Sequence, residues 1–168
     1  MAASANAEAI AHLTEGLKLI GSLPASSERI SREIDFRLAL VAPLTAIRGW
    51  GSVETQAAYA RVRELCAGAD ETPELFRSLV GLWNHHLNQP DLETASELSR
   101  ELFNLAAKLG SDEFRLLAEY AACITCFCSG RYGSAASHAA RVPVLYDPER
   151  HRGPKIYWTD PAMLALSF

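Results

Sequence analysis

The sequence predicts an all-α fold, a tetratricopeptide-like α-solenoid in which antiparallel helix hairpins form degenerate repeats of roughly 40 residues. Apolar residues recur at helical spacing along almost the whole chain. No alternating run of apolar and polar residues is bounded by hairpin turns, so strands are not expected. Alanines return at matching places in successive predicted hairpins, as expected where repeated helix pairs stack on one another.

The composition is that of a globular protein. The chain has 168 residues, of which 49% are hydrophobic and 21% charged, which predicts one helical-repeat domain over 1–168. The net charge is −4, and the basic residues are scattered among acids, which argues against a nucleic-acid partner. The amphipathic pattern begins so near the first residue that we expect the chain to be a piece of a longer protein.

Membrane and secretory signals are not evident in the sequence. No stretch approaches the roughly 18–20 apolar residues that cross a bilayer, and the N-terminus lacks the basic and apolar regions of a signal peptide. Three of the four cysteines are bunched together, unlike the disulfide framework of a small secreted domain. We therefore expect a reduced, cytoplasmic protein without a membrane partner.

Three helices are predicted in the first part of the chain. The first covers roughly 5–20 and is broken by GSLPASS. The second runs from about 27 to 47 and stops at RGWGS, whose glycines suit a helix end. Ser52 can cap the third, because a serine hydroxyl accepts a hydrogen bond from the first turn.

The later helices have clearer start and stop signals. Thr72 and the proline after it predict a helix start, and that helix reaches about Asn88. Asp91 caps the next helix, which ends at Gly110. Ser111 then caps a sixth helix that extends through the cysteine-rich segment.

The C-terminal part is less regular. A seventh helix is predicted from Tyr132 to about Tyr146. The following stretch, DPERHRGPKIYWTDP, is too rich in proline, glycine and charge to be regular. Pro161 is expected to open an eighth helix that the chain end cuts short.

The repeat is marked by small residues. Ala95 and Ala135 occupy the same place in successive hairpins, Ala57 lies a similar step earlier, and Ala9 lies somewhat further back. A small side chain lets two helices cross closely. Each hairpin leaves an apolar face that its neighbour covers, and this arrangement is the solenoid.

The segment GRYGSA resembles the turn of a tetratricopeptide repeat. Gly130, Tyr132 and Ala135 fill its glycine, aromatic and alanine positions, and counting back places Cys123 at the small residue of the first helix. The repeats are degenerate, because Trp83 stands at that small position one hairpin earlier and a proline replaces the preceding turn glycine.

Longer segments sharpen this resemblance. In order along the chain they are AEAIAHLTEGLKLIGSLP, AAYARVRELC, GLWNHH, LETASELSRELFNLAAKLGS, VLYDPERHR and DPAMLALS. They are similar to the helical-repeat C-terminal region of bacterial multidomain adenylate/guanylate cyclase-like predicted ATPases. The resemblance implies a regulatory or interaction module that follows cyclase-type and ATPase domains. The sequence has neither a phosphate-binding G-x-x-x-x-G-K-[ST] loop nor the paired aspartates of a cyclase, so we expect no enzyme activity.

The cysteines of AACITCFCSG are expected to be core residues and not a metal cluster. On a helix Cys123 and Cys126 share a face, whereas Cys128 points away. A hairpin fold brings His138 level with Cys123, so the sequence leaves open whether Cys123, Cys126 and His138 meet. A closed zinc site needs a fourth ligand that is not evident, and we predict no metal and no cofactor.

Other candidate sites are interpreted as structural. His85 and His86 diverge by about 100° on a helix, so one is expected to face the neighbouring helix and the other the groove or the solvent. Cys66 has no histidine close in sequence and is expected to be packed or exposed without a catalytic role. The basic residues of YDPERHRG lack a glycine-rich nest before a helix and are interpreted as a solvated connector.

The predicted function follows from the repeat architecture. Repeat arrays bind partners on the surface formed by the first helix of each hairpin. In the predicted register, the residues on that surface that can hold a peptide through hydrogen bonds and an aromatic contact are Arg77, Asn84, Asn88 and Tyr120. We expect a non-catalytic module that binds a protein or peptide, including other domains of the same chain. The alternative is a small-molecule or metal sensor with a Cys/His site between the sixth and seventh helices.

The ends of the array predict self-association. The first helix lacks a preceding partner and the last is truncated, so both ends leave apolar surface that a longer chain would cover. A homodimer through these ends is therefore expected.

Overall fold

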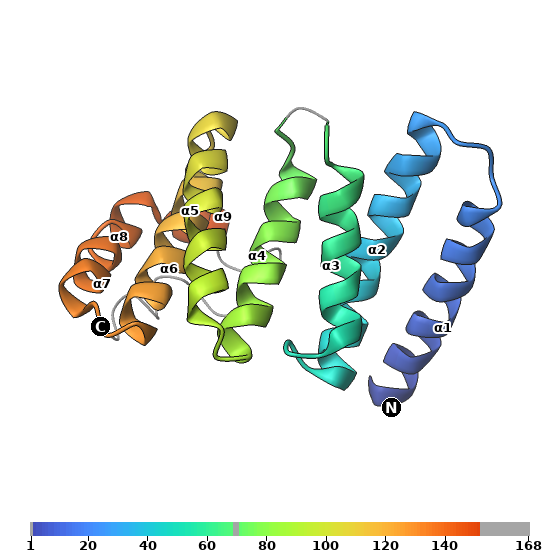
Figure 1. Cartoon of the computed structure of the whole chain (residues 1–168), viewed down its shortest axis with the longest axis horizontal. Coiled ribbons are helices and arrows are strands. Elements are labelled where there is room, and N and C mark those ends of the chain that lie inside the picture. The colour runs from blue at the N-terminus through green and yellow to red at the C-terminus, as the bar shows by residue number, and fades with distance from the viewer. Residues whose placement is uncertain (1, 69–70, 152–168) are drawn as a thin grey trace. The chain divides into compact units, whose positions relative to one another are not determined.

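The computed structural model describes residues 2–68 and 71–151, and within these ranges the chain contains helices and no strand (Figure 1). The all-α prediction is confirmed for this part of the chain. The chain divides into two compact units, Met1–Gln89 and Pro90–Phe168. We describe each unit by itself.

The first unit is built from four helices that run in alternating directions, each packed on the next (Figure 1). They are α1 (Ala2–Gly21), α2 (Ser27–Arg48), α3 (Val53–Leu65) and α4 (Pro73–Asn88). The predicted boundaries are reproduced closely because each depends on a local signal. The Ser52 and Thr72 hydroxyls accept hydrogen bonds from the N–H groups of Thr55 and Leu75.

The most deeply buried large side chains of this unit lie on α3 and α4. Phe76 and Trp83 on α4 are almost completely buried, as is Val62 on α3. Gly81 faces Tyr59 on α3, and a Cβ atom at position 81 would overlap the Tyr59 ring. Glycine therefore makes the close approach of these two helices possible.

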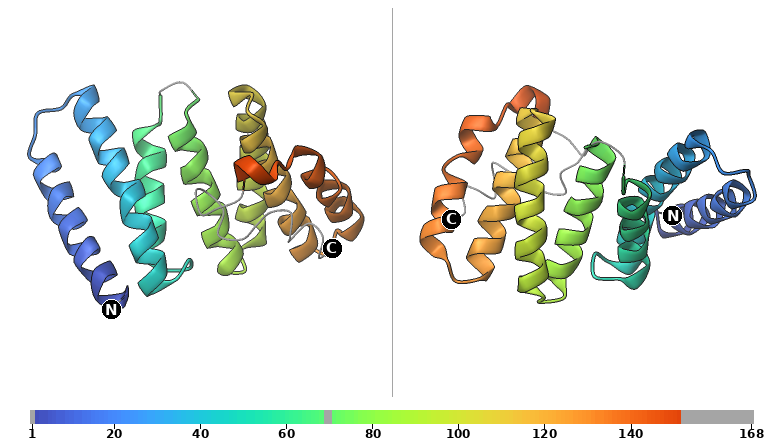
Figure 2. Two further views of the ribbon diagram at one scale, coloured as in Figure 1. Left: turned by 180° about the vertical axis from the view of Figure 1, so that it is seen from behind. Right: turned by 45° about the horizontal axis from the view of Figure 1, so that its top comes forward.

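The second unit has α6 at its centre, with α5 and α7 packed against it (Figures 1 and 2). Its helices are α5 (Leu92–Leu109), α6 (Asp112–Cys128), α7 (Tyr132–Ala139), α8 (Val142–Leu145) and α9 (Pro148–His151). The Asp91 and Ser111 side chains cap α5 and α6 as predicted. Gly110 ends α5 in the left-handed conformation with φ of 70°.

Two predictions for the C-terminal part are wrong. The helix expected from Tyr132 to about Tyr146 is broken into α7 and α8. Pro143, which lies in the first turn of α8, lacks the backbone N–H that a continuous helix needs and clashes with the preceding turn. Part of the stretch expected to be irregular forms α9, where the Asp147 carboxylate accepts a hydrogen bond from the N–H of Glu149 at 2.9 Å. The helix predicted at Pro161 lies outside the described residues.

The small residues of the predicted repeat agree with the structure to different degrees. Ala95 and Ala135 are buried, at 0% and 2% exposure. Ala57 is exposed and its neighbour Ala58 is buried, so the register expected there is shifted by one residue. Ala9 is half-buried. Packing of consecutive helices is established within each unit, whereas a continuous solenoid and a single domain over 1–168 stay predictions.

Candidate functional site

The predicted peptide-binding residues fall on two helices. Arg77, Asn84 and Asn88 lie on one stripe of α4, since they are spaced by seven and four residues. Asn88 Nδ2 donates hydrogen bonds to the backbone oxygen of Asn84 at 2.8 Å and to its Oδ1 at 3.1 Å. Arg77 is exposed on the same stripe, and Tyr120 lies half-buried on α6 in the second unit. The structure thus brings three of the four onto one helix face and ties the two asparagines together.

The cysteine-rich segment is part of the core, as predicted. Cys123 and Cys126 are 2% and 7% exposed and cluster with Ala135 and Ala139 of α7. Cys128 is exposed, and all four cysteines are free thiols. Burial raises the pKa of the Cys123 thiol, and the neighbouring Cys126 and Glu119 raise it further. A buried thiol with a raised pKa is a poor nucleophile and a poor metal ligand.

His138 is held by a carboxylate that the sequence reasoning missed. Glu119 Oε2 lies 2.7 Å from His138 Nδ1, and Glu119 Oε1 lies 3.3 Å from an Arg141 guanidinium nitrogen. Among the described residues, no group of three or more His, Cys, Asp and Glu side chains is placed to hold a metal ion. Cys123, Cys126 and His138 therefore do not form such a site there. The available signal was an acid within the apolar run LLAEYAAC, where a buried carboxylate needs a partner.

A polar hollow of the second unit is a cleft formed by α5, α6, the turn between α6 and α7, and α7. Its volume is about 370 Å³. It is lined by Ser96, Ser99, Arg100, Phe103, Asn104, Ala122, Thr125, Cys126, Arg131 and His138. The lining carries two arginines and a histidine but no acid, in a chain whose net charge is −4. We call this hollow the basic cleft.

A second hollow lies beside the basic cleft. It has a volume of about 380 Å³ and is lined by Phe103, Ala106, Ala107, Arg115, Ala118, Glu119, Arg141, Val144 and Leu145. Phe103 lines both hollows, and its ring packs edge-on against His138 with the centroids 5.6 Å apart. We call it the apolar groove. None of Arg77, Asn84, Asn88 and Tyr120 lines either hollow.

The two arginines of the basic cleft are available to a ligand. Arg100 lies on α5 and Arg131 in the α6–α7 turn, and both are exposed. Neither guanidinium group forms an ion pair within the part of the chain that the structure describes. His138 differs, because its Nδ1 is already occupied by Glu119. The cleft therefore presents two uncompensated cations from separate elements.

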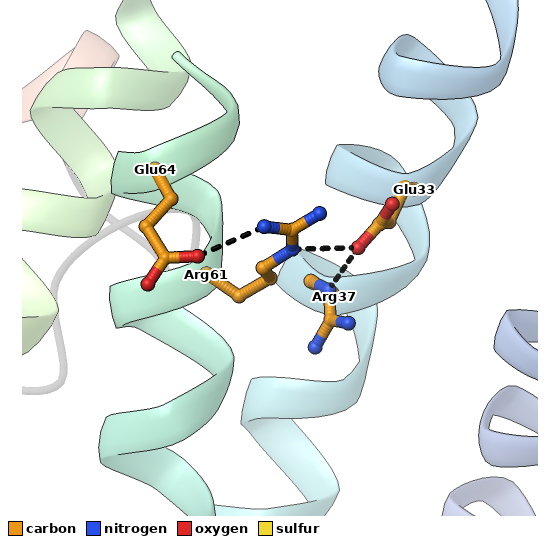
Figure 3. Close-up of polar contacts among 4 residues, drawn as sticks. All are labelled: Glu33, Arg37, Arg61 and Glu64. Atoms are coloured by element: carbon orange, nitrogen blue, oxygen red, sulfur yellow. Dashed lines mark hydrogen bonds and ion pairs between the residues drawn. The ribbon is translucent and has the colours of Figure 1, made fainter. Parts of the chain in front are cut away.

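The first unit contains a charge cluster around one buried carboxylate (Figure 3). Glu33 on α2 is 7% exposed, and its Oε1 lies 2.9 Å from Arg37 Nε and 3.1 Å from Arg61 Nε of α3. Arg61 also binds Glu64 at 2.9 Å. Burial alone would raise the pKa of Glu33, but the hydrogen bonds and charges of Arg37 and Arg61 outweigh it and lower that pKa. The carboxylate is held ionised and joins α2 to α3, which is a structural role.

The adjacent histidines diverge as predicted. His85 is 6% exposed, and its Nδ1 lies 3.3 Å from the backbone oxygen of Trp50. Burial lowers the pKa of His85 despite that contact. His86 is half-buried. The pair is therefore not a ligand pair on one helix face.

The remaining candidates have simple environments. Cys66 is 4% exposed at the end of α3, and burial raises the pKa of its thiol. The backbone of Arg150 and His151 belongs to α9, whereas Arg152 lies outside the described residues.

In the described part of the chain, no helix combines the length and the apolar character needed to cross a bilayer.

The basic cleft is therefore the arrangement with the clearest capacity to bind a ligand. Comparisons of the chain with protein-family models, with curated proteins and with solved structures give no match.

Proposed function

We propose that the chain is a non-catalytic interaction module that binds a segment of another protein or of another domain of its own chain. The observation that carries the proposal is the basic cleft, an open hollow of about 370 Å³ with two uncompensated arginines. Its lining combines hydrogen-bonding side chains with apolar contact at Phe103 and Ala122, a combination suited to holding an extended backbone with one side chain inserted. The thiols near it are buried, which disfavours nucleophilic chemistry.

The larger context of the module is also part of the proposal. The resemblance to the C-terminal region of cyclase-like predicted ATPases supports a signalling protein in which this segment reports on a partner. The packing of consecutive helices within each unit is compatible with repeat hairpins that continue as a solenoid.

A binding selection tests the proposal directly. The full chain is immobilised and challenged with a displayed library of random peptides, and an enriched peptide is then titrated by calorimetry. Ser96 lines the basic cleft and is half-buried, so Ser96→Trp is expected to fill it and abolish binding. Asn84→Trp is the matched control, because Asn84 is half-buried on α4 and lies outside the cleft.

The same pair of variants separates the two surfaces that the chain offers. Loss of binding only in Asn84→Trp would move the site to the α4 stripe predicted from the sequence. A selection that enriches no peptide, or nucleotide hydrolysis or cyclisation at enzyme-like rates, would overturn the proposed function.

A small-molecule sensor is the second candidate, and one observation favours it. Cys126 and His138, two of the three residues of the predicted Cys/His site, both line the basic cleft. Its metal version requires stoichiometric zinc in protein purified without a metal-chelating tag. Its organic version requires a small anion such as ATP to bind while all selected peptides fail.

A further inference from the structure

We propose that the basic cleft is a receptor for an acidic peptide segment, whose carboxylates pair with Arg100 and Arg131. This inference rests on the proposed function and adds the chemical class of the partner. It also places the partner on the side of α6 where α5 and α7 pack, instead of on the α4 stripe that the sequence predicts.

The first argument is the charge of the residues that line the basic cleft. A chain with 20 acidic and 16 basic residues would by chance surround most hollows with mixed charge. The basic cleft has Arg100, Arg131 and His138 and no acid among its lining residues. Of these three residues, His138 is contacted by an acid, Glu119, whose two carboxylate oxygens face His138 and Arg141. Its negative charge is thus compensated by these partners and does not cancel the charge of Arg100 or Arg131.

The placement of the two arginines indicates an extended ligand. Arg100 belongs to the middle of α5, and Arg131 precedes the first residue of α7. They approach the cleft from different elements, so pairing each arginine with its own negative group requires a ligand that carries at least two such groups. A peptide with several aspartates or glutamates meets this requirement, and each guanidinium can hold a carboxylate through paired hydrogen bonds.

The rest of the lining suits a peptide better than a nucleic-acid backbone. Phe103 and Ala122 offer apolar contact, whereas a phosphate backbone needs a dense basic stripe that this acidic chain lacks. The polar groups at Ser96 and Asn104 can bind peptide amides. Thr125 is not counted, since its hydroxyl already donates to the backbone oxygen of Ala121 at 2.7 Å.

The role of His138 is limited by its partner. With Nδ1 bound to Glu119, only Nε2 remains for the cleft, and Nε2 is a donor only in the protonated ring. The proposal therefore rests on the two arginines alone.

The test uses the full chain and a fluorescein-labelled oligoglutamate peptide, followed by fluorescence anisotropy at low salt. Oligolysine and glycine–serine peptides of the same length are the probe controls. Arg100→Gln and Arg131→Gln are each expected to weaken oligoglutamate binding by about fivefold, and the double variant by more than about tenfold. Raising the salt concentration is expected to weaken binding to the wild-type chain and to have less effect on the double variant.

Arg77→Gln is the matched protein control, because Arg77 is an exposed arginine on α4 outside the cleft. It is expected to bind oligoglutamate like the wild type. The paired change of Arg100 and Arg131 to lysine keeps both charges and is expected to restore most of the affinity, which separates loss of charge from misfolding. Circular dichroism verifies the helical content of each variant.

The outcomes distinguish this inference from the proposed function. Equal binding by the wild type and the double glutamine variant, or loss only in Arg77→Gln, overturns the acidic-segment proposal. If oligoglutamate fails while the random library yields neutral or basic peptides, the interaction module stands and its acidic specificity is wrong. If oligoglutamate and the whole library fail and ATP alone binds, both proposals fall and the sensor takes their place.

Discussion

Glu33 is a carboxylate whose burial is made possible by two arginines, Arg37 on the next turn of α2 and Arg61 on α3. An ionised group removed from water is costly unless charged partners compensate it. Arg61 reaches Glu33 from α3, so the same contact that compensates the charge also fixes α2 against α3. The contact between Glu33 and Arg61 could not be predicted from the sequence, because a partner 28 residues away leaves no local pattern.

Glu33→Gln is expected to lower the free energy of unfolding by about 1–2 kcal/mol at pH 7, with the exposure of Arg61 taken into account. The pKa of Glu33 is lowered in the folded chain from its ordinary value of 4.5. Its stabilising contribution is therefore complete above about pH 4.5 and is lost as the pH falls from there through the folded pKa. Urea unfolding across this range is expected to show the variant and the wild type converging at acid pH. Glu28→Gln, whose carboxylate is 73% exposed beside Arg32, should change little at any pH.

The four cysteines are expected to differ sharply in reactivity. Cys128 is exposed, whereas Cys66, Cys123 and Cys126 are buried. Burial raises the pKa of the Cys66 and Cys123 thiols, so less of the reactive thiolate is present at neutral pH. Iodoacetamide followed by peptide mass spectrometry should label Cys128 first, and Cys128→Ser should remove the fast phase. Rapid labelling of Cys123 would show that the helix core opens readily.

At the scale of the element, helix ends were predictable and helix interruptions were not. Thr72, Asp91 and Ser111 cap helices at the expected positions, because a capping side chain binds a backbone N–H only two or three residues away. The break before Pro143 was missed, although proline is a local signal, since the apolar pattern continues across it. The basic cleft could not be predicted, because its lining combines three elements whose spacing depends on how they pack.

The close approach of α3 and α4 depends on the absence of a side chain at Gly81. Gly81→Ala is expected to destabilise the chain by about 1–3 kcal/mol, because the new methyl group overlaps the Tyr59 ring. Thermal unfolding followed by circular dichroism measures the effect. Gly133→Ala is the control: position 133 lies in α7 with nothing within 4 Å of an added Cβ, so stability should rise slightly.

A double substitution tests whether overlap with the Tyr59 ring causes the loss of stability in Gly81→Ala. Gly81→Ala combined with Tyr59→Leu removes part of the overlapping ring, so the pair should lose less stability than the sum of the single changes. Additive losses would mean that the cost at position 81 has another origin.

At the scale of the whole molecule, the chain is divided after Gln89. The helices of each unit pack on one another. In the first unit, Phe76 and Trp83 are buried. Expressed separately, 1–89 and 90–168 are each expected to remain helical and to be less stable than the full chain, since smaller units bury a smaller share of their surface. Circular dichroism spectra of the two pieces should sum to that of the whole. An unfolded piece would show that its fold depends on the other unit.

Self-association also belongs to this scale. Leu19 and Leu23, at the end of α1 and just beyond it, are 63% and 44% exposed, and apolar surface at an array end was the reason for predicting a homodimer. Light scattering over a range of protein concentrations is expected to show a dimer. A chain that stays monomeric at high concentration would contradict the prediction.

The basic cleft and the apolar groove are linked by shared side chains. Phe103 belongs to both hollows, and Glu119, which lines the groove, holds His138, which lines the cleft. A change at either of these two positions reaches both hollows: a larger or smaller residue at 103, or a neutral one at 119, alters a wall of each. A substitution at 103 or 119 that is meant to change ligand binding in one hollow would therefore change the other hollow as well.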